Sequence, residues 1–435
     1  MKRTAVIIGG GVSGLSAAYK FVQAGWNAHL LEARDELGGL TRSMDLGSGR
    51  IERYYHFICG GDTHLLRLAD ELGVADKIHF APAPVGHFYR GRMYPFSTAL
   101  DVLRFSPLSV ADRMRLGWHT LKAQKRTDWR PLDEITAKEW LLSTVGPRVY
   151  EVLWRPLLEI KFGPYHDQVS AAWLWHRMWR VGTSRKSAME SDAMGYFEGG
   201  SETLLNALAE AARKGGAEIS TGVKAQKIVG DGDGRWRVAT DKGDVEGDAV
   251  VMATPLPVAA DLVREEMPAW SEALGAVPYL GVVCALLRAE KSVTDYFWVN
   301  VNDERVAANG FIEYGNLNRG REVWGGDTLY VPMYLPATDP RFAWSDEEWA
   351  KHLGDGLGVI DAAYPGRVTA KIVTRDVFAQ PVCTPGFAER TPSMVGPKKG
   401  VLLVEASQLY PSDRCLSGMI GLAGIAVRRA GESDR

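Results

Sequence analysis

The sequence of 435 residues predicts an α/β protein, and three consecutive features near its N-terminus carry that prediction. Residues 4–8 (TAVII) are a short apolar run rich in β-branched side chains, as expected of a buried parallel strand. The glycine-rich stretch GGGVSG follows at 9–14, and apolar residues then recur at helical spacing. A second apolar run at 28–31 ends on Glu32. This order predicts a Rossmann-like strand–helix–strand unit over residues 1–42.

The glycine pattern gives each position of the loop a physical role. Gly9, Gly11 and Gly14 match GxGxxG, in which the first glycine permits a tight turn and the second lets the backbone approach a pyrophosphate. The third lets the helix pack closely on the strand, and the free N–H groups at the helix N-terminus bind the phosphates. Glu32 stands where an acid accepts the two hydroxyl hydrogens of an adenosine ribose. The unit is therefore expected to bind a dinucleotide.

Composition excludes several other classes of protein. The net charge is −2, which gives no general attraction to nucleic acid, so a DNA- or RNA-binding role is not expected. The four cysteines are scattered, without CxxC or a histidine partner at metal spacing, so no metal site is expected and free thiols suit a reducing compartment. No apolar stretch reaches the ~20 residues that a membrane-spanning helix needs. The sequence thus predicts a cytoplasmic protein.

The stretch ARDELGGLTRS at 33–43 separates FAD from NAD. It resembles the second half of the FAD signature shared by monoamine oxidases, protoporphyrinogen oxidases, phytoene desaturases and UDP-galactopyranose mutases. In that superfamily the paired glycines, here Gly38 and Gly39, bring the backbone close to the FAD pyrophosphate and ribityl chain, and the nearby arginine lies beside the phosphates. The resemblance implies FAD in a glutathione-reductase-type domain. The sequence around Cys415 does not match the attachment segment of monoamine oxidases, so the FAD is expected to be non-covalent.

The superfamily builds its FAD domain from separated segments, and later parts of this chain resemble them. They comprise a paired-glycine element before a helix, a strand near the adenine, two strands that return to the cofactor, and a final helix whose positive N-terminus would face the flavin. These parts are residues 195–212, 217–223, 250–255, 401–405 and 417–428. Val223 would offer its backbone to the adenine. Glu405 stands where family members carry a ribityl-binding acid, although Val404 here replaces the glycine that usually precedes it.

The dinucleotide unit and the resemblance together imply a set of FAD contacts and a division into domains. The expected contacts are Gly9, Gly11, Val12, Ser13, Gly14, Glu32, Ala33, Arg34, Gly38, Gly39, Leu40, Arg42, Val223, Glu405 and Met419. The expected Rossmann-like FAD-binding domain comprises residues 1–75, 191–265 and 391–435. An α+β substrate-binding domain would then comprise residues 76–190 and 266–390.

The first part of the substrate domain is rich in tryptophan and locally basic. Between Leu103 and Arg130 there are seven basic residues against Asp112 and Asp128. This pattern fits a solvated helical face. It also fits a basic amphipathic helix that rests on anionic lipid or receives a phosphorylated substrate. Residues 103–130 are therefore a candidate for peripheral contact with the inner face of a membrane, and a lipid-like or phosphorylated small molecule is a candidate substrate.

Two short stretches supply candidate catalytic and substrate residues. Tyr55 and His56 follow the paired-glycine element at the distance where the superfamily brings its chain past the flavin ring, so His56 is either an acid/base or a packing histidine. Lys161 and Phe162 precede Gly163 in an element that resembles desaturases and UDP-galactopyranose mutases, so Lys161 either lines the substrate pocket or compensates a helix dipole. Arg414, just before the final helix, is a further candidate substrate contact.

The resemblance implies an FAD-dependent oxidoreductase that transfers a hydride from a CH–NH or CH–CH group to flavin N5. Oxygen, a quinone or a partner protein would reoxidise the flavin, because the sequence shows no second GxGxxG unit for a nicotinamide cofactor. Two alternatives stay open. One is a non-redox sugar mutase that resembles UDP-galactopyranose mutase, and the other is a flavin-binding module without turnover.

Overall fold

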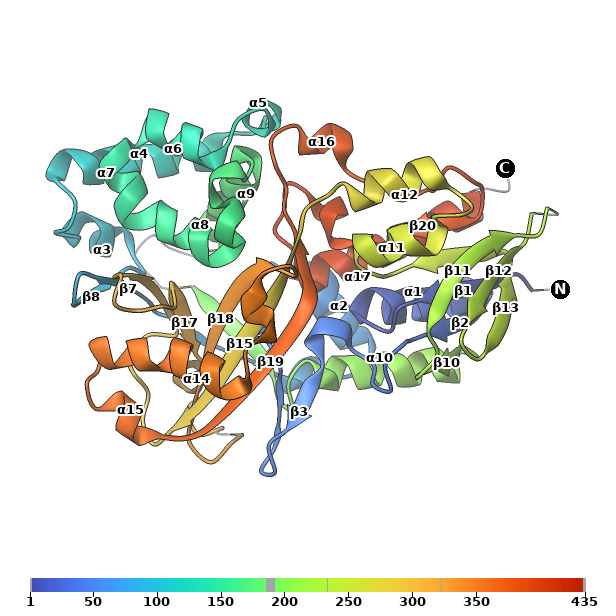
Figure 1. Cartoon of the computed structure of the whole chain (residues 1–435), viewed down its shortest axis with the longest axis horizontal. Coiled ribbons are helices and arrows are strands. Elements are labelled where there is room, and N and C mark those ends of the chain that lie inside the picture. The colour runs from blue at the N-terminus through green and yellow to red at the C-terminus, as the bar shows by residue number, and fades with distance from the viewer. Residues whose placement is uncertain (1, 185–191, 233, 322, 433–435) are drawn as a thin grey trace.

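The computed structural model describes residues 2–184, 192–232, 234–321 and 323–432, and Figure 1 shows them as two adjoining parts. One part holds a parallel sheet with helices packed around it. The other holds a larger mixed sheet with a group of helices beside it. The chain passes between the two parts several times, as the colours in Figure 1 make plain.

The parallel sheet has five strands in the order β10-β2-β1-β14-β20. Every neighbouring pair runs parallel, which confirms the predicted α/β fold class with a Rossmann-like sheet. Its strands are β1 (Thr4–Ile8), β2 (Asn27–Leu31), β10 (Glu218–Ser220), β14 (Ala249–Met252) and β20 (Val401–Leu403). They come from three stretches of sequence that lie far apart.

Alternate residues of β1 face opposite sides of this sheet, and both sides are covered. Ala5 and Ile7 pack in one core with three helices, α1 (Val12–Gln23), α10 (Glu202–Lys214) and α17 (Leu416–Glu432). Val6 and Ile8 pack in a second core with α11 (Leu256–Val263) and a small antiparallel sheet. That sheet comprises β11 (Ala225–Gly230), β12 (Trp236–Thr240) and β13 (Gly243–Gly247). Burial on both faces explains why β1 is apolar throughout.

The approach of α1 to β1 requires glycine at two positions. Gly9 has a φ of 110°, a conformation that other residues rarely adopt. A Cβ atom on Gly14 would lie 1.8 Å from the Gly9 carbonyl oxygen, so any side chain there would force the helix away from the strand. The sequence prediction for these two glycines therefore has a direct steric basis.

The second part is built on a seven-stranded mixed sheet in the order β19-β15-β18-β17-β16-β7-β8. Its long central strands pair in antiparallel fashion, whereas β16 and β7 pair in parallel. The strands are β7 (Val85–Tyr89), β8 (Arg92–Pro95), β15 (Tyr279–Ala289), β16 (Trp298–Asn302), β17 (Gly310–Glu313), β18 (Asp327–Pro336) and β19 (Val368–Pro381). A strand hairpin from the first insert thus completes a sheet whose other strands come from the second.

The helices of the first insert form a separate group beside this sheet (Figure 1). They include α3 (Ala99–Arg104), α4 (Val110–Lys125), α6 (Ala137–Thr144), α8 (Arg155–Phe162) and α9 (Ala171–Ser184). Trp140, Trp173 and Trp175 are buried in their core, and the Trp175 indole N–H donates to the carbonyl of Ala123 on α4 at 2.8 Å. These three tryptophans thus pack the helices of this insert together.

Short strands lie at the junction between the two parts. A three-stranded sheet joins β5 (Ile58–Cys59), β9 (Ala193–Phe197) and β6 (Ile78–Pro82), and β3 (Ser43–Asp45) pairs with β4 (Arg50–Glu52). The domain boundaries expected from the sequence stay a prediction. Among the helices that the structure describes, none combines the length and apolar character needed to cross a bilayer.

Candidate functional site

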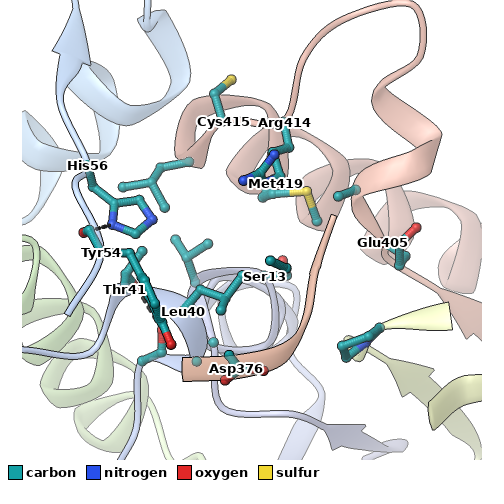
Figure 2. Close-up of a pocket in the computed structure, with 18 of the residues that line it drawn as sticks. Ser13, Leu40, Thr41, Tyr54, His56, Asp376, Glu405, Arg414, Cys415 and Met419 are labelled. Carbon is teal, nitrogen blue, oxygen red and sulfur yellow. Dashed lines mark hydrogen bonds between the residues drawn. The ribbon is translucent and has the colours of Figure 1, made fainter. Parts of the chain in front are cut away.

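A cavity of about 1350 Å³ extends from the carboxyl end of β1 to the sheet of the second part. This volume exceeds the ~300–1,000 Å³ of most small-molecule pockets, so it has room for a dinucleotide together with a substrate. Figure 2 shows residues from widely separated segments facing one space, with His56 on one side and Arg414 and Met419 on another.

Seventeen of the residues predicted from the sequence line this cavity. They are Gly9, Gly11, Val12, Ser13, Glu32, Ala33, Arg34, Gly38, Gly39, Leu40, Tyr55, His56, Lys161, Val223, Glu405, Arg414 and Met419. The structure thus brings the expected cofactor, catalytic and substrate residues into one site.

Three predicted residues do not line the cavity. Gly14 lies behind the cavity wall and contacts the Gly9 carbonyl oxygen, so it lets α1 pack close to β1. The Arg42 side chain turns back, and its Nε donates to the Gly39 carbonyl oxygen at 2.8 Å. Phe162 is buried against Trp173, with ring centroids 4.7 Å apart, so it packs the helical group instead of reaching the cavity.

The N-terminus of α1 forms one end of the cavity and is suited to an anion. No side chain caps the helix at Gly11, and its first turn has no acidic residue, so the N–H groups and the positive end of the helix dipole are available. A Cβ atom on Gly11 would meet only the Gly39 Cα, at 3.9 Å, which leaves open space beside Gly11. This end of the cavity fits a pyrophosphate.

Glu32 at the end of β2 is held by two backbone donors. Its Oε2 accepts from the Gly10 N–H at 2.6 Å and its Oε1 from the Arg34 N–H at 2.9 Å. The carboxylate is buried and lines the cavity. It is therefore fixed in orientation before any ligand arrives, as a ribose-binding acid should be.

Two of the three later cofactor candidates, Val223 and Glu405, have protein partners of their own. The Val223 N–H donates to the Glu32 carbonyl oxygen at 2.9 Å, so the Val223 carbonyl is the group that remains for adenine. Glu405 accepts from the Tyr279 hydroxyl at 2.9 Å and from the Ser407 N–H at 2.7 Å, and burial raises the pKa of its carboxyl. Glu405 thus stabilises the turn after β20 as well as lining the cavity.

Asp376 on β19 is a cavity residue that the sequence analysis did not identify. Its Oδ2 accepts from Arg34 at 2.8 Å and lies 3.9 Å from Arg42. The second part of the molecule therefore holds the two arginines of the expected phosphate region. No local motif marks Asp376, because its partners lie more than three hundred positions away in sequence.

The cavity wall offers polar groups that a dinucleotide could use. Thr254 lines the cavity, and its buried hydroxyl has no hydrogen-bond partner among the described residues. Together with the uncapped α1 N-terminus and the fixed Glu32 carboxylate, this gives a donor, an acceptor and an anion site along one wall. The residues present therefore fit a dinucleotide such as FAD.

His56 lies beside the cavity with a defined tautomer. Its Nδ1 is 2.7 Å from the Tyr54 carbonyl oxygen, so Nδ1 carries the proton and Nε2 is the free acceptor. Burial lowers the pKa of His56 to about 4, although the Tyr54 carbonyl opposes the shift. His56 is therefore neutral at physiological pH.

Lys161 in the last turn of α8 reaches the cavity from the helical group. Its Nζ lies 3.7 Å from Asp413 Oδ2, and the same oxygen accepts from Arg177 Nη1 at 3.1 Å. Burial lowers the pKa of Lys161 to about 7, with Asp413 opposing and the nearby Arg177 and Arg414 adding to the shift. Burial alone would raise the pKa of Asp413, but the surrounding cations outweigh it and hold that pKa below its usual value.

Arg414 and two tyrosines complete this side of the cavity. Arg414 Nη2 donates to the Tyr334 hydroxyl at 3.1 Å, and Arg414 Nη1 donates to Gln380 Oε1. The Tyr334 and Tyr55 hydroxyls are 3.4 Å apart, and burial raises the pKa of Tyr55, so it stays protonated. The predicted substrate residues Tyr55 and Arg414 are thus linked through Tyr334.

The sequence analysis also missed the cations supplied by α9. Arg177 and Arg180 lie three residues apart on one face of the helix, and both line the cavity. Arg180 Nη2 donates to Asp62 Oδ1 at 2.9 Å. A helical repeat of basic residues among tryptophans was the available signal, but it does not distinguish a cavity wall from a solvated face.

Cys415 lines the cavity next to Arg414, which raises the question of covalent flavin attachment. Its Sγ accepts from the Gly418 N–H at 3.3 Å. Burial raises the pKa of the Cys415 thiol, so little thiolate is present at neutral pH. A protonated thiol is a poor nucleophile, which supports the prediction of non-covalent FAD.

Changing Glu32→Ala should lower the flavin content of the purified protein and its melting temperature. The change removes the expected ribose contacts, each worth roughly 1.5–3 kcal/mol, and frees the Gly10 and Arg34 amides. Glu36→Ala is the matched control, because Glu36 is exposed and pairs with Arg53 at 3.5 Å, at the rim of the same loop. Flavin absorbance per protein and thermal unfolding measure both effects. Equal flavin content in the two variants would show that Glu32 does not bind the cofactor.

Solved structures with the same fold cover nearly the whole chain. A reduced UDP-galactopyranose mutase matches with a TM-score of 0.76 and 16% identity over 100% of this chain and 99% of that one. An oxidoreductase from Methanosarcina mazei matches with a TM-score of 0.74 and 17% identity over 98% and 99%. Putrescine oxidase bound to putrescine matches with a TM-score of 0.73 and 16% identity over 100% of both chains. These similarities show a shared fold.

Curated relatives match over shorter regions at higher identity. Putrescine oxidase of Kocuria rosea is 30% identical over 149 residues, which is 32% of this chain and 31% of the relative. Amine oxidase [flavin-containing] B of Bos taurus is 30% identical over 203 residues, or 41% and 36%. The matches thus span about a third of these relatives' length. The model of the family described as flavin containing amine oxidoreductase matches residues 12–352. The chain therefore belongs to the flavin containing amine oxidoreductase family, which confirms the family resemblance and the FAD cofactor predicted from its sequence.

Proposed function

We propose that the chain oxidises a small molecule at a CH–NH or CH–CH group. The supporting observation is that Lys161, His56, Tyr55 and Arg414 share one cavity with the uncapped N-terminus of α1. FAD, held at the N-terminus of α1 and by Glu32, would supply the hydride acceptor, N5, and oxygen, a quinone or a partner protein would be the final electron acceptor. The amine oxidases among the relatives favour a CH–NH donor.

Each such oxidation removes a hydride and a proton, and the protein must accept the proton. Lys161, whose pKa lies at about 7, is half neutral at neutral pH and can take it on Nζ. His56, whose pKa lies at about 4, is a much weaker base. Its free Nε2 is better suited to orient a donor group of the substrate. We therefore assign proton transfer to Lys161 and substrate positioning to His56.

Aromatic side chains shape the space between these groups. Tyr55 packs edge-on against Trp298, with centroids 5.5 Å apart, and stacks with Phe57 at 6.2 Å. All three residues line the cavity. An apolar wall of this kind excludes water from the reacting carbon and holds a flat or apolar substrate against the flavin.

Two alternatives from the sequence analysis remain distinguishable by experiment. In a sugar mutase the flavin must first be reduced, and the reductant is then not consumed. In a flavin-binding module no small molecule changes the redox state of the flavin. Bleaching of the flavin by substrate alone, without added reductant, supports the oxidoreductase proposal over both.

Replacing Lys161 or His56 should slow reduction of the flavin while leaving FAD bound. Lys161→Met removes the proton acceptor, so the rate should fall on the order of a hundredfold. The wild-type rate should rise with pH through about 7, as Lys161 loses its proton, and the variant should lack that rise. His56→Ala should slow reduction with no change in this pH profile.

Anaerobic stopped-flow measurement of flavin absorbance checks these rates. Lys138→Met is the control, because Lys138 lies outside the cavity wall and pairs with Asp167 at 2.7 Å. If both site variants reduce at the wild-type rate but melt earlier, Lys161 and His56 are structural residues.

We further propose that residues 103–130 rest on an anionic membrane surface. Within the described residues, five of the eleven exposed large apolar side chains lie between 103 and 121, and Trp118 is 63% exposed. Val110, Met114, Trp118 and Leu121 fall on one face of α4, while Leu116 and Ala123 on another face are buried. The helix thus presents an apolar ridge to solvent.

Basic residues flank this ridge, which favours a lipid over a second protein. Lys122 Nζ lies 5.4 Å from the Trp118 ring centroid. Trp118 and Lys122 line a shallow depression on the surface, and Lys125 and Arg126 border it as well. An apolar ridge edged by cations matches the boundary between acyl chains and anionic headgroups. A cytoplasmic location against the inner face of the membrane accords with this proposal.

Trp118→Ser combined with Met114→Ser should weaken binding to vesicles of phosphatidylcholine and phosphatidylglycerol. Co-sedimentation measures this, and binding of the wild type should also fall with added salt and with phosphatidylcholine alone. Ile425→Ser, an exposed apolar residue on another helix, should bind like the wild type. Equal sedimentation of the double variant and the wild type would contradict the proposal. Self-association through the ridge, seen as a larger mass without vesicles, would do so too.

A further inference from the structure

The side of the cavity formed by α8, α9 and the start of α17 carries more positive than negative charge. Lys161, Arg177 and Arg414 surround a single carboxylate, that of Asp413, and all four residues line the cavity. The Lys161 and Asp413 side chains are only 8% and 15% exposed. We call this group of four residues the cationic pocket. Even with Lys161 neutral, two guanidinium groups face one carboxylate.

Arg414 is the member whose charge is least compensated. Its hydrogen-bond partners are neutral: the Tyr334 hydroxyl at 3.1 Å and the Gln380 amide oxygen. Among the described residues, no carboxylate lies within ion-pair distance of Arg414, since Asp413 pairs with Lys161 and Arg177 instead. A partly buried cation without a counterion is costly, and such groups occur where a ligand supplies the opposite charge.

We propose that the cationic pocket binds an anionic group of the substrate, a carboxylate or a phosphate, with Arg414 as its principal partner. The planar guanidinium offers paired donors that match either group. This inference rests on the proposed function for the identity of the site, and it names the substrate class that the reaction takes. An alkylammonium ion without an anionic group would meet net repulsion here.

The negative charge of reduced flavin is the competing explanation for the same cations. Arg414 lies two residues before α17, the helix whose N-terminus is expected to face the flavin. Oxidised flavin carries no such charge on its ring system. Binding of an anion to the oxidised holoenzyme therefore separates the two explanations.

The test is titration of oxidised holoenzyme with acetate and, separately, with inorganic phosphate, followed by flavin absorbance and by calorimetry. At least one anion should bind, and Arg414→Gln should weaken its affinity roughly ten- to a hundredfold. Arg414→Lys keeps the charge but loses the paired donors, so its anion affinity should lie between that of the wild type and that of Arg414→Gln. Arg155→Gln is the control, because Arg155 is exposed on the same helix as Lys161 and pairs with Glu151 and Glu159. An alkylammonium ion should not bind.

The two anions distinguish the ligand classes, since acetate reports a carboxylate site and phosphate a phosphate site. Failure of both anions to bind wild-type holoenzyme overturns the inference, whatever the folding of the variants. Unchanged anion affinity in Arg414→Gln, with a lower flavin midpoint potential, also overturns it and assigns the charge to reduced flavin. Anion binding without any substrate that bleaches the flavin would support the pocket while contradicting the proposed oxidation.

Discussion

The contact between Gly14 and the Gly9 carbonyl fixes where α1 begins relative to the end of β1, and the site depends on that position. Because a Cβ atom there would lie 1.8 Å from that oxygen, only glycine lets α1 begin so close to the end of β1. This approach places the uncapped N-terminus of α1 at the cavity wall and brings Glu32, at the end of the adjacent strand, into hydrogen-bond distance of the Gly10 amide. A helix displaced by even an ångström would lose both the phosphate-binding end and the fixed carboxylate.

Charge is distributed unevenly along the cavity, and the two charged regions are suited to different ligands. At the nucleotide end, Arg34 and Arg42 are held by Asp376 from the second part of the molecule, so the two parts are tied together beside the expected phosphates. At the other end, the cationic pocket has one carboxylate for its basic groups. The aromatic wall of Tyr55, Phe57 and Trp298 lines the same cavity, and the Tyr55 hydroxyl is linked to Arg414 through Tyr334. The cavity thus combines two charged regions with an apolar wall that a neutral flavin ring can contact.

The local geometry at the α1 end of the cavity could be predicted because its determinants are local, while the contacts with FAD stay a prediction. Gly9, Gly14 and Glu32 have roles set by one turn, one helix start and one strand end, all within the first thirty-two residues. The opposite end depends on register between distant segments, so Asp376 carried no recognisable signal. Lys161 and Phe162 show a second limit. Neighbouring helical residues point about 100° apart, so one reaches the cavity while the other packs in the core. Sequence proximity alone could not say which.

The central claim is that this cavity holds FAD through a dinucleotide site centred on α1 and Glu32. The most direct measurement is to denature the purified protein, separate the released cofactor by chromatography and identify it by absorbance and mass. The account predicts a yellow protein that releases intact FAD in stoichiometric amount without proteolysis, because the adenosine, the pyrophosphate and the flavin each have a place along the cavity. Release of FMN, which lacks the adenosine that Glu32 would hold, or of NAD alone, would contradict it.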